Sequence, residues 1–134
     1  MAIDLVDGAT RVDLKRVGKD SEGKPLDLPP ATVFVRKEKR SDQVRIMRAV
    51  GVAEGSASDQ VAYASLRVRW SIVGAENFTD ANSLKTVLFT QIIHPTLGQI
   101  ASEAVFDALN DADFALVFAA SDPASKATEP LKGN

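Results

Sequence analysis

Five polar residues recur at every second position between Gln60 and Ile72, in the segment QVAYASLRVRWSI. They are Tyr63, Ser65, Arg67, Arg69 and Ser71, and they alternate with apolar residues. Successive side chains of a β-strand point to opposite faces of its sheet, so this spacing predicts a strand with one buried and one polar face. A tyrosine, two small hydroxyls and two arginines in one column suit the phosphates and unpaired bases of RNA. The alternative is a solvated sheet face that binds nothing.

The charge distribution points in the same direction. Between Thr32 and Ile72 the basic residues Arg36, Lys37, Lys39, Arg40, Arg45, Arg48, Arg67 and Arg69 stand against only four acidic ones, Glu38, Asp42, Glu54 and Asp59. From Thr79 onward the acidic residues outnumber the lysines, and the net charge of the chain is −2. A basic sheet with an acidic remainder fits a protein that presents one face to a polyanion. A dipolar protein without such a partner is the alternative.

Composition excludes several classes of site. The 134 residues predict one domain with an ordinary core. The absence of cysteine excludes disulfides and thiolate chemistry, and a single histidine excludes a histidine metal cluster within one chain. No apolar run is long enough to span a bilayer, and the N-terminus lacks the pattern of a secretion signal. His94 has no partner for acid–base work, and Asp107, Asp111 and Asp113 are expected to solvate a helix end, so we expect neither an enzyme nor a cofactor.

The elements that would position the polar column are mostly strands. Residues 3–6 and 10–17 predict an N-terminal hairpin around Asp7-Gly8, within residues 1–18. Residues 32–37, 44–52 and 60–72 predict further strands, which gives an antiparallel meander of about five strands whose later part is residues 31–73. Trp70 lies on the apolar face of the last strand and is expected to be core.

Two helices are expected after the sheet, within residues 79–110. The first begins at Thr79 or Asp80 and ends at His94-Pro95, and the second runs from Leu97 to Asn110. Residues 111–134 form a C-terminal extension, in which 113–120 are a strand or a helical turn. Strands followed by helices predict an α+β fold. Both the sheet and the two helices present apolar stripes, and the helices are joined by too little chain to bury much surface alone. An intimate dimer, in which each chain lays its helices over the partner's sheet, would bury both.

This order of elements resembles the coat proteins of single-stranded RNA bacteriophages. Ala62-Tyr63-Ala64-Ser65 is similar to the AYAD-type strand of that family, and Leu97 to Asn110 is similar to its final apolar helix. The likeness covers residues 3–110. It implies a capsid protein whose helices interlock with a second subunit, whose dimers assemble an icosahedral shell, and whose open sheet binds a hairpin of the genomic RNA as a packaging signal or translational operator. It also implies location in the virion, and in the bacterial cytoplasm during assembly.

The resemblance also implies site residues. Tyr63 matches the tyrosine that stacks on an unpaired base, Ser65 a neighbouring RNA contact, and Arg45 a basic residue on the adjoining strand. Arg36 occupies a position that is usually small and polar in the family, while Arg67 and Arg69 would contact phosphates without reading sequence.

Two other functions remain open. A small dimeric α+β regulator that binds RNA and never assembles a shell would use the same basic face. A ligand-binding α+β domain would instead hold a small molecule between its sheet and its helices.

Overall fold

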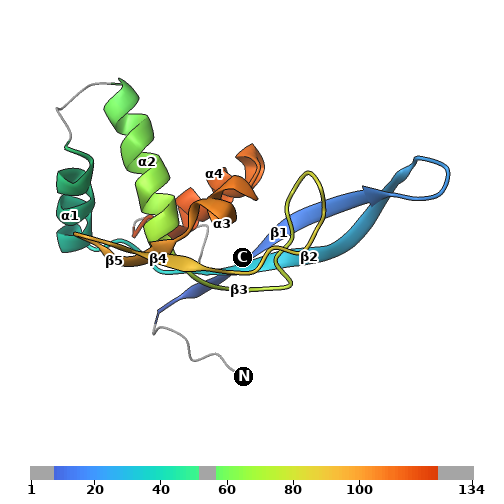
Figure 1. The fold of residues 1–134 in the computed structure, drawn as a ribbon, viewed down its shortest axis with the longest axis horizontal. Coiled ribbons are helices and arrows are strands. Elements are labelled where there is room, and N and C mark those ends of the chain that lie inside the picture. The colour runs from blue at the N-terminus through green and yellow to red at the C-terminus, as the bar shows by residue number, and fades with distance from the viewer. Residues whose placement is uncertain (1–7, 52–56, 124–134) are drawn as a thin grey trace, which may run out of the picture.

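The computed structural model describes residues 8–51 and 57–123. It confirms the α+β class: an antiparallel sheet in the order β1-β2-β3 comes with a separate pair of strands, β4-β5, and with helices. The helices gather on one side of the two sheets (Figure 1). The elements are β1 (Thr10–Lys19), β2 (Pro25–Val35), α1 (Arg40–Val50), α2 (Ala57–Ser71), β3 (Ile72–Glu76), β4 (Gln91–His94), β5 (Gly98–Ala101), α3 (Glu103–Asp107) and α4 (Asp111–Ser121).

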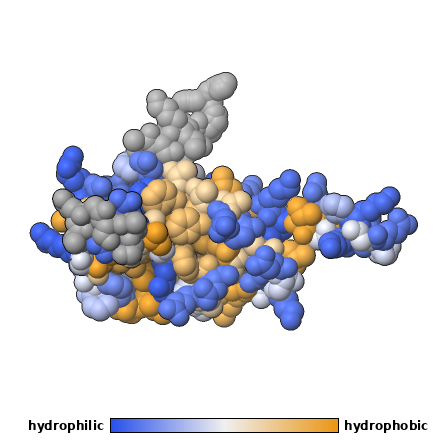
Figure 2. All heavy atoms as spheres, turned by 90° about the horizontal axis from the view of Figure 1, so that it is seen from above, coloured by the Kyte–Doolittle hydropathy of each residue, from blue (hydrophilic) through white to orange (hydrophobic). Residues whose placement is uncertain are grey.

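A long β-hairpin, formed by β1 and β2, extends well beyond the helices (Figure 1). Its turn is closed by Asp20, whose carboxylate accepts the backbone N–H groups of Glu22 and Lys24, and by Gly23 at a φ of +80°. Figure 2 shows that the far end is mostly hydrophilic, whereas apolar side chains gather over the body. The strand predicted at 10–17 is therefore confirmed, but it pairs with β2. Its predicted partner, residues 3–6, lies outside the described residues.

The prediction of a strand at 60–72 is wrong, because this segment forms helix α2 up to Ser71. The segment contains alanine, leucine, glutamine and arginine, and all four favour helices. On a helix, an apolar residue at every second position spreads around the axis instead of making one face. That distribution suits α2, since Val68 packs into one apolar cluster and Trp70 into another. Burial does not alternate: Arg67 is buried and Leu66 only partly so.

The strand predicted at 44–52 is also wrong, because residues 40–50 form helix α1. Its start is stabilised by Asp42, whose carboxylate accepts the backbone N–H of Lys39. Its end is Gly51, which has a φ of +70° and donates its N–H back into the last turn. Arg48 interrupts the apolar pattern of a strand, but on the helix it is simply exposed. The five-stranded meander thus loses two of its strands to helices.

Neither long helix predicted within residues 79–110 forms. Asp80 does accept the N–H groups of Asn82 and Ser83, as a helix cap would, but the turn ends at Leu84 with a φ of +64°. Ile92 and Ile93 then extend into β4, because β-branched residues favour strands. His94 turns the chain into β5 by accepting the N–H groups of Thr96 and Leu97. Within the second predicted helix only the five residues of α3 are helical, and α4 falls in the expected C-terminal extension.

Two apolar clusters make up the core of the described residues. The larger cluster lies between the three-stranded sheet, α2 and the C-terminal helices, and its members include Leu14, Val33, Val68, Val105 and Val117. The smaller one joins α1, α2 and β5 through Ile46, Trp70, Leu97 and Ile100. Trp70 is 2% exposed, which confirms its prediction as core.

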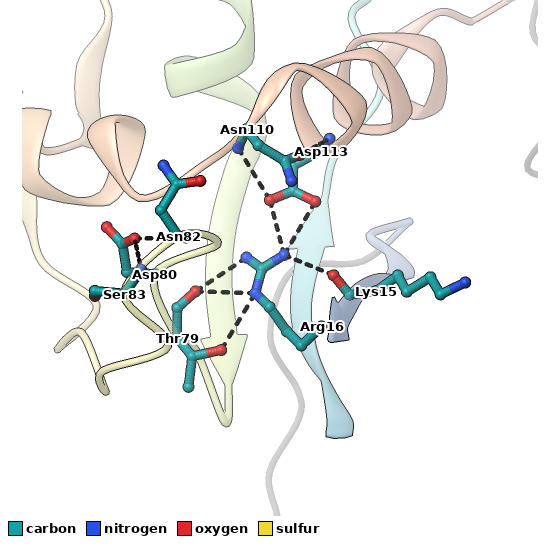
Figure 3. Close-up of polar contacts among 8 residues, drawn as sticks. All are labelled: Lys15, Arg16, Thr79, Asp80, Asn82, Ser83, Asn110 and Asp113. Carbon is teal, nitrogen blue, oxygen red and sulfur yellow. Dashed lines mark hydrogen bonds and ion pairs between the residues drawn. The ribbon is translucent and has the colours of Figure 1, made fainter. Parts of the chain in front are cut away.

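A buried ion pair ties the hairpin to α4 (Figure 3). Nη1 of Arg16 lies 2.9 Å from Oδ2 and 3.1 Å from Oδ1 of Asp113, and both side chains are almost completely buried. Arg16 also donates to the backbone oxygens of Thr79 and Lys15. Asp113 in turn accepts the N–H of Asn110 at the start of α4. One guanidinium therefore connects β1, α4 and the loop after β3.

Candidate nucleic-acid interface

The arginine side chains of helix α1 are exposed to solvent. Ile46 is fully buried against α2, while Arg40, Arg45 and Arg48 are exposed on the other side of the helix. At 100° per residue these three arginines fall within an arc of about 140°. Lys39 precedes the helix and is also exposed. We call Lys39, Arg40, Arg45 and Arg48 the α1 basic face.

Little negative charge offsets this face. Asp42 forms an ion pair with Arg45 at 2.8 Å, and its other oxygen accepts the N–H of Lys39. Within the described part of the chain, the side chains of Arg40 and Arg48 have no hydrogen bond or ion pair. These two arginines are eight residues apart, about 12 Å along the helix, so they can reach different phosphates of one strand. Exposed guanidinium groups of this kind bind phosphate oxygens.

Arg36 lies beside α1 but is held inward. Its Nε donates to the backbone oxygen of Trp70 at 3.1 Å, and its guanidinium lies 4.1 Å from the centroid of the Trp70 ring. Burial lowers the pKa of Arg36, the nearby Asp42 raises it, and the Arg45 charge lowers it again. Of the predicted site residues, Arg45 therefore lies on α1 and Arg36 lies beside it.

Tyr63 and Arg67 do not lie on an open face. One helical turn apart on α2, they converge on the buried Glu38, which accepts the Tyr63 hydroxyl and lies 3.6 Å from Arg67. Arg67 is only 6% exposed, and it also donates to Ser121 Oγ at 2.7 Å and to the Phe118 backbone oxygen at 2.9 Å. These contacts join α2 to α4. Stacking of Tyr63 on a base stays a prediction to which this arrangement gives no support.

The electrostatics of this cluster follow from its burial. Burial raises the pKa of Glu38 above its ordinary value, and the hydrogen bond from Tyr63 and the Arg67 charge only partly offset that effect. Burial also raises the pKa of the Tyr63 hydroxyl, as does its hydrogen bond to Glu38. The neutral form of the phenol is therefore favoured, and it donates inward to Glu38.

Ser65 and Arg69 occupy a different side of α2, because two residues span about 200° on a helix. They line an open groove of about 530 Å³ between α2, α3 and the end of α1, together with Val50, Ala62, Leu66, Glu103, Phe106 and Asp107. Arg69 donates its Nε to the Ala101 backbone oxygen at 2.9 Å. Its Nη2 is buried with no hydrogen-bond partner among the described residues. The column of Tyr63, Ser65, Arg67 and Arg69 is therefore divided between two places.

Sequence reasoning did not assign Lys39, Arg40 or Arg48 to the site. Their signal was present in the excess of basic residues after Thr32, but a strand at 44–52 would have placed Arg45 and Arg48 on opposite faces. Helical periodicity brings Arg40, Arg45 and Arg48 to one side instead.

Comparisons with protein-family models, curated protein sequences and solved structures gave no match. Among residues 8–51 and 57–123, no three histidine, aspartate or glutamate side chains are grouped so that they could hold a metal ion. The part of the chain that the structure describes contains no helix with the length and apolar character needed to cross a membrane.

Proposed function

We propose that this protein is an RNA-binding structural protein of the coat type, which associates with copies of itself and packages RNA. The observation that carries the proposal is the α1 basic face, a concentration of exposed arginines on a chain whose net charge is −2. Such a face attracts a polyanion, while the acidic remainder keeps the assembled copies from binding it over every surface.

Binding is expected to depend on phosphate contacts rather than on base reading. Lysine and arginine contacts to phosphates release counterions and act on any sequence. Recognition of single-stranded bases usually adds aromatic stacking, but Tyr63 is half-buried against Glu38 and Trp70 is buried. We therefore propose packaging of single-stranded RNA through α1, in place of a hairpin read by Tyr63.

Self-association is supported by large apolar side chains on the surface. Leu88 is 79% exposed, Ile93 71% and Ile92 46%. Leu88 and Ile92 belong to the first of the two helices that the sequence predicted, and the resemblance to coat proteins implied that those helices interlock with a second subunit. Although they lie on a loop and a strand, their exposure still supports a contact with another copy, and an interlocked dimer that builds an icosahedral shell remains our proposal for the assembly. Location in a virion, and in a bacterial cytoplasm during assembly, belongs to the same proposal.

A dimeric RNA-binding regulator that never forms a shell is the second candidate, since it would need the same basic face. The two are distinguished by expressing the protein in bacteria, fractionating it by size-exclusion chromatography, and examining it by electron microscopy. The coat proposal predicts particles in the void volume that contain nuclease-protected RNA. A discrete dimer that binds added RNA would instead support the regulator, and a monomer without RNA would overturn both.

A further inference from the structure

Among the described residues, strand β4 pairs with another strand on one side only. It pairs antiparallel with β5, from Gln91 opposite Ala101 to His94 opposite Gly98, in a sheet of just two strands. Two-stranded sheets have little stability of their own, and an unpaired strand edge is a template for another strand. The outer edge of β5 is partly occupied, because its Ala101 oxygen accepts a hydrogen bond from Arg69 of α2. No described residue makes such a bond to the outer edge of β4.

The hydrogen-bond pattern shows which residues face that open edge. The N–H of Ser102 donates to the Thr90 oxygen at 3.0 Å, so these opposite residues form a hydrogen-bonded pair. Such pairs alternate along an antiparallel ladder, so Ile92 bonds toward β5 whereas the backbone groups of Gln91 and Ile93 point away from it. The hydrogen bond of Ala101, which lies opposite Gln91, is consistent with this pattern: its backbone oxygen accepts from Arg69 and so points away from β4. No other described residue forms a hydrogen bond with the backbone of Gln91 or Ile93.

The side chains of β4 suit a partner strand. Ile92 lies opposite Ile100, which is 1% exposed and belongs to the smaller apolar cluster, while Ile92 itself is 46% exposed. Ile93 points to the other face and is 71% exposed. Edge strands that must stay unpaired are usually protected by lysine, proline or an inward charge, and β4 carries none of these.

We propose that β4 pairs antiparallel with β4 of a second copy across a two-fold axis at Ile92. In this register Gln91 lies opposite the partner's Ile93, and Ile93 opposite the partner's Gln91. The outward backbone groups on both sides then form four hydrogen bonds. The occupant is a second copy because the proposed function requires the chain to associate with itself, and this register satisfies the outward backbone groups of both copies alike. The contact makes one four-stranded sheet and places Ile92 against the partner's Ile92, which covers a side chain that is 46% exposed in the single chain.

The inference rests on the proposed function only in that the chain associates with itself, and RNA has no part in it. It is therefore tested on protein from which RNA has been removed with nuclease and high salt. Because the chain has no cysteine, an introduced one reports a single contact. Non-hydrogen-bonded antiparallel pairs have Cα atoms about 4.5 Å apart, within the range of disulfides. Ile92→Cys should therefore cross-link to a covalent dimer on mild oxidation, whereas Ser21→Cys at the exposed hairpin turn should not.

A second variant removes one donor from the edge. Proline at position 93 removes an N–H that points away from β5, so Ile93→Pro keeps the bonds between β4 and β5. It should weaken the dimer at least tenfold in analytical ultracentrifugation, whereas Leu26→Ala, an apolar change on the hairpin at a residue that is 46% exposed, should change it less than twofold. A monomeric wild-type chain, or a dimer in which Ile92→Cys does not cross-link, overturns the inference. Should Ile93→Pro fail to fold, cross-linking alone decides.

Failure of the proposed function would look different. A β4-paired dimer that forms no particles and binds no RNA would leave the inference standing and remove the coat proposal. RNA-filled particles built from subunits that do not cross-link at residue 92 would support the coat proposal and overturn the pairing of β4.

Discussion

At the scale of single residues, burial decides which charged groups are free to act. Arg67 and Glu38 are both almost inaccessible and are engaged with each other and with α4, so they hold the fold together. Arg40 and Arg48 carry the same guanidinium as Arg67, but they lie on the surface without a partner among the described residues. Identical chemistry thus serves structure in one place and, as we propose, phosphate binding in another.

The cluster around Glu38 should make stability depend on pH. Because burial raises the folded-state pKa of Glu38 above its ordinary value of 4.5, its contribution is complete below that value and is lost as the pH rises through the folded pKa. The Glu38→Gln variant has no ionisable carboxyl group at this position, so it serves as the reference. The free energy of unfolding of the wild type, relative to that of Glu38→Gln, should therefore fall as the pH rises from about 4.5, as measured by urea denaturation.

Glu22→Gln, an exposed change in the hairpin turn, is the control and should leave the pH profile unchanged. A wild-type advantage that instead grows with pH would show that attraction by Arg67 outweighs burial at Glu38.

At the scale of elements, α1 gathers cations that are dispersed along the sequence. Its buried residue, Ile46, fixes which side faces α2, and the remaining positions leave Arg40, Arg45 and Arg48 outward. The helix also explains why the candidate site differs from the predicted one, because on a strand these arginines would have been divided between two faces.

The α1 basic face is tested by removing its charge without disturbing the helix. Glutamine has a helix propensity similar to that of arginine, so the triple variant Arg40→Gln, Arg45→Gln, Arg48→Gln should fold normally. Each lost phosphate contact reduces the slope of log K against log salt by about 0.7 for single strands, so three contacts should reduce it by about 2. Filter binding to single-stranded RNAs of different sequence should show the same loss for all of them.

The matched control carries the same change in charge on the hairpin, as Lys15→Gln, Lys19→Gln, Lys24→Gln. If both triple variants lower affinity equally, net charge alone governs binding and α1 is no specific interface.

At the scale of the whole molecule, separate regions of the chain are joined by a few buried polar contacts. Arg16 and Asp113 are 97 residues apart, and their ion pair holds β1 against α4. The hairpin beyond this point extends away from the helices (Figure 1). The ion pair is therefore where the extended hairpin is anchored to the body.

Breaking this pair should cost far more than breaking a surface pair. Arg16→Met or Asp113→Leu alone leaves a buried charge without its partner, which should cost about 3–5 kcal/mol of unfolding free energy. The double variant should cost less than the sum of the two by about 1–3 kcal/mol, since it leaves no uncompensated charge. Chemical denaturation of the four proteins measures this coupling.

Arg11→Ala is the control, because Arg11 pairs with Asp13 and Glu76 at the surface with 57% of its side chain exposed, and it should cost less than about 1 kcal/mol. Additive single effects in the double variant would mean that Arg16 and Asp113 contribute independently.

The α+β class could be predicted from the sequence, and so could the strand at 10–17, the burial of Trp70 and the basic character of residues 36–48, because these depend on residue type and local pattern. The sequence could not determine whether residues 60–72 were strand or helix. Apolar residues at every second position satisfy a strand with one buried face, and they equally satisfy a helix that packs on two sides. Only the tertiary structure supplied the second side, by placing Val68 in one apolar cluster and Trp70 in another. Because this segment is a helix, Arg67 lies in the interior, and the cations of α1 are the ones that remain at the surface.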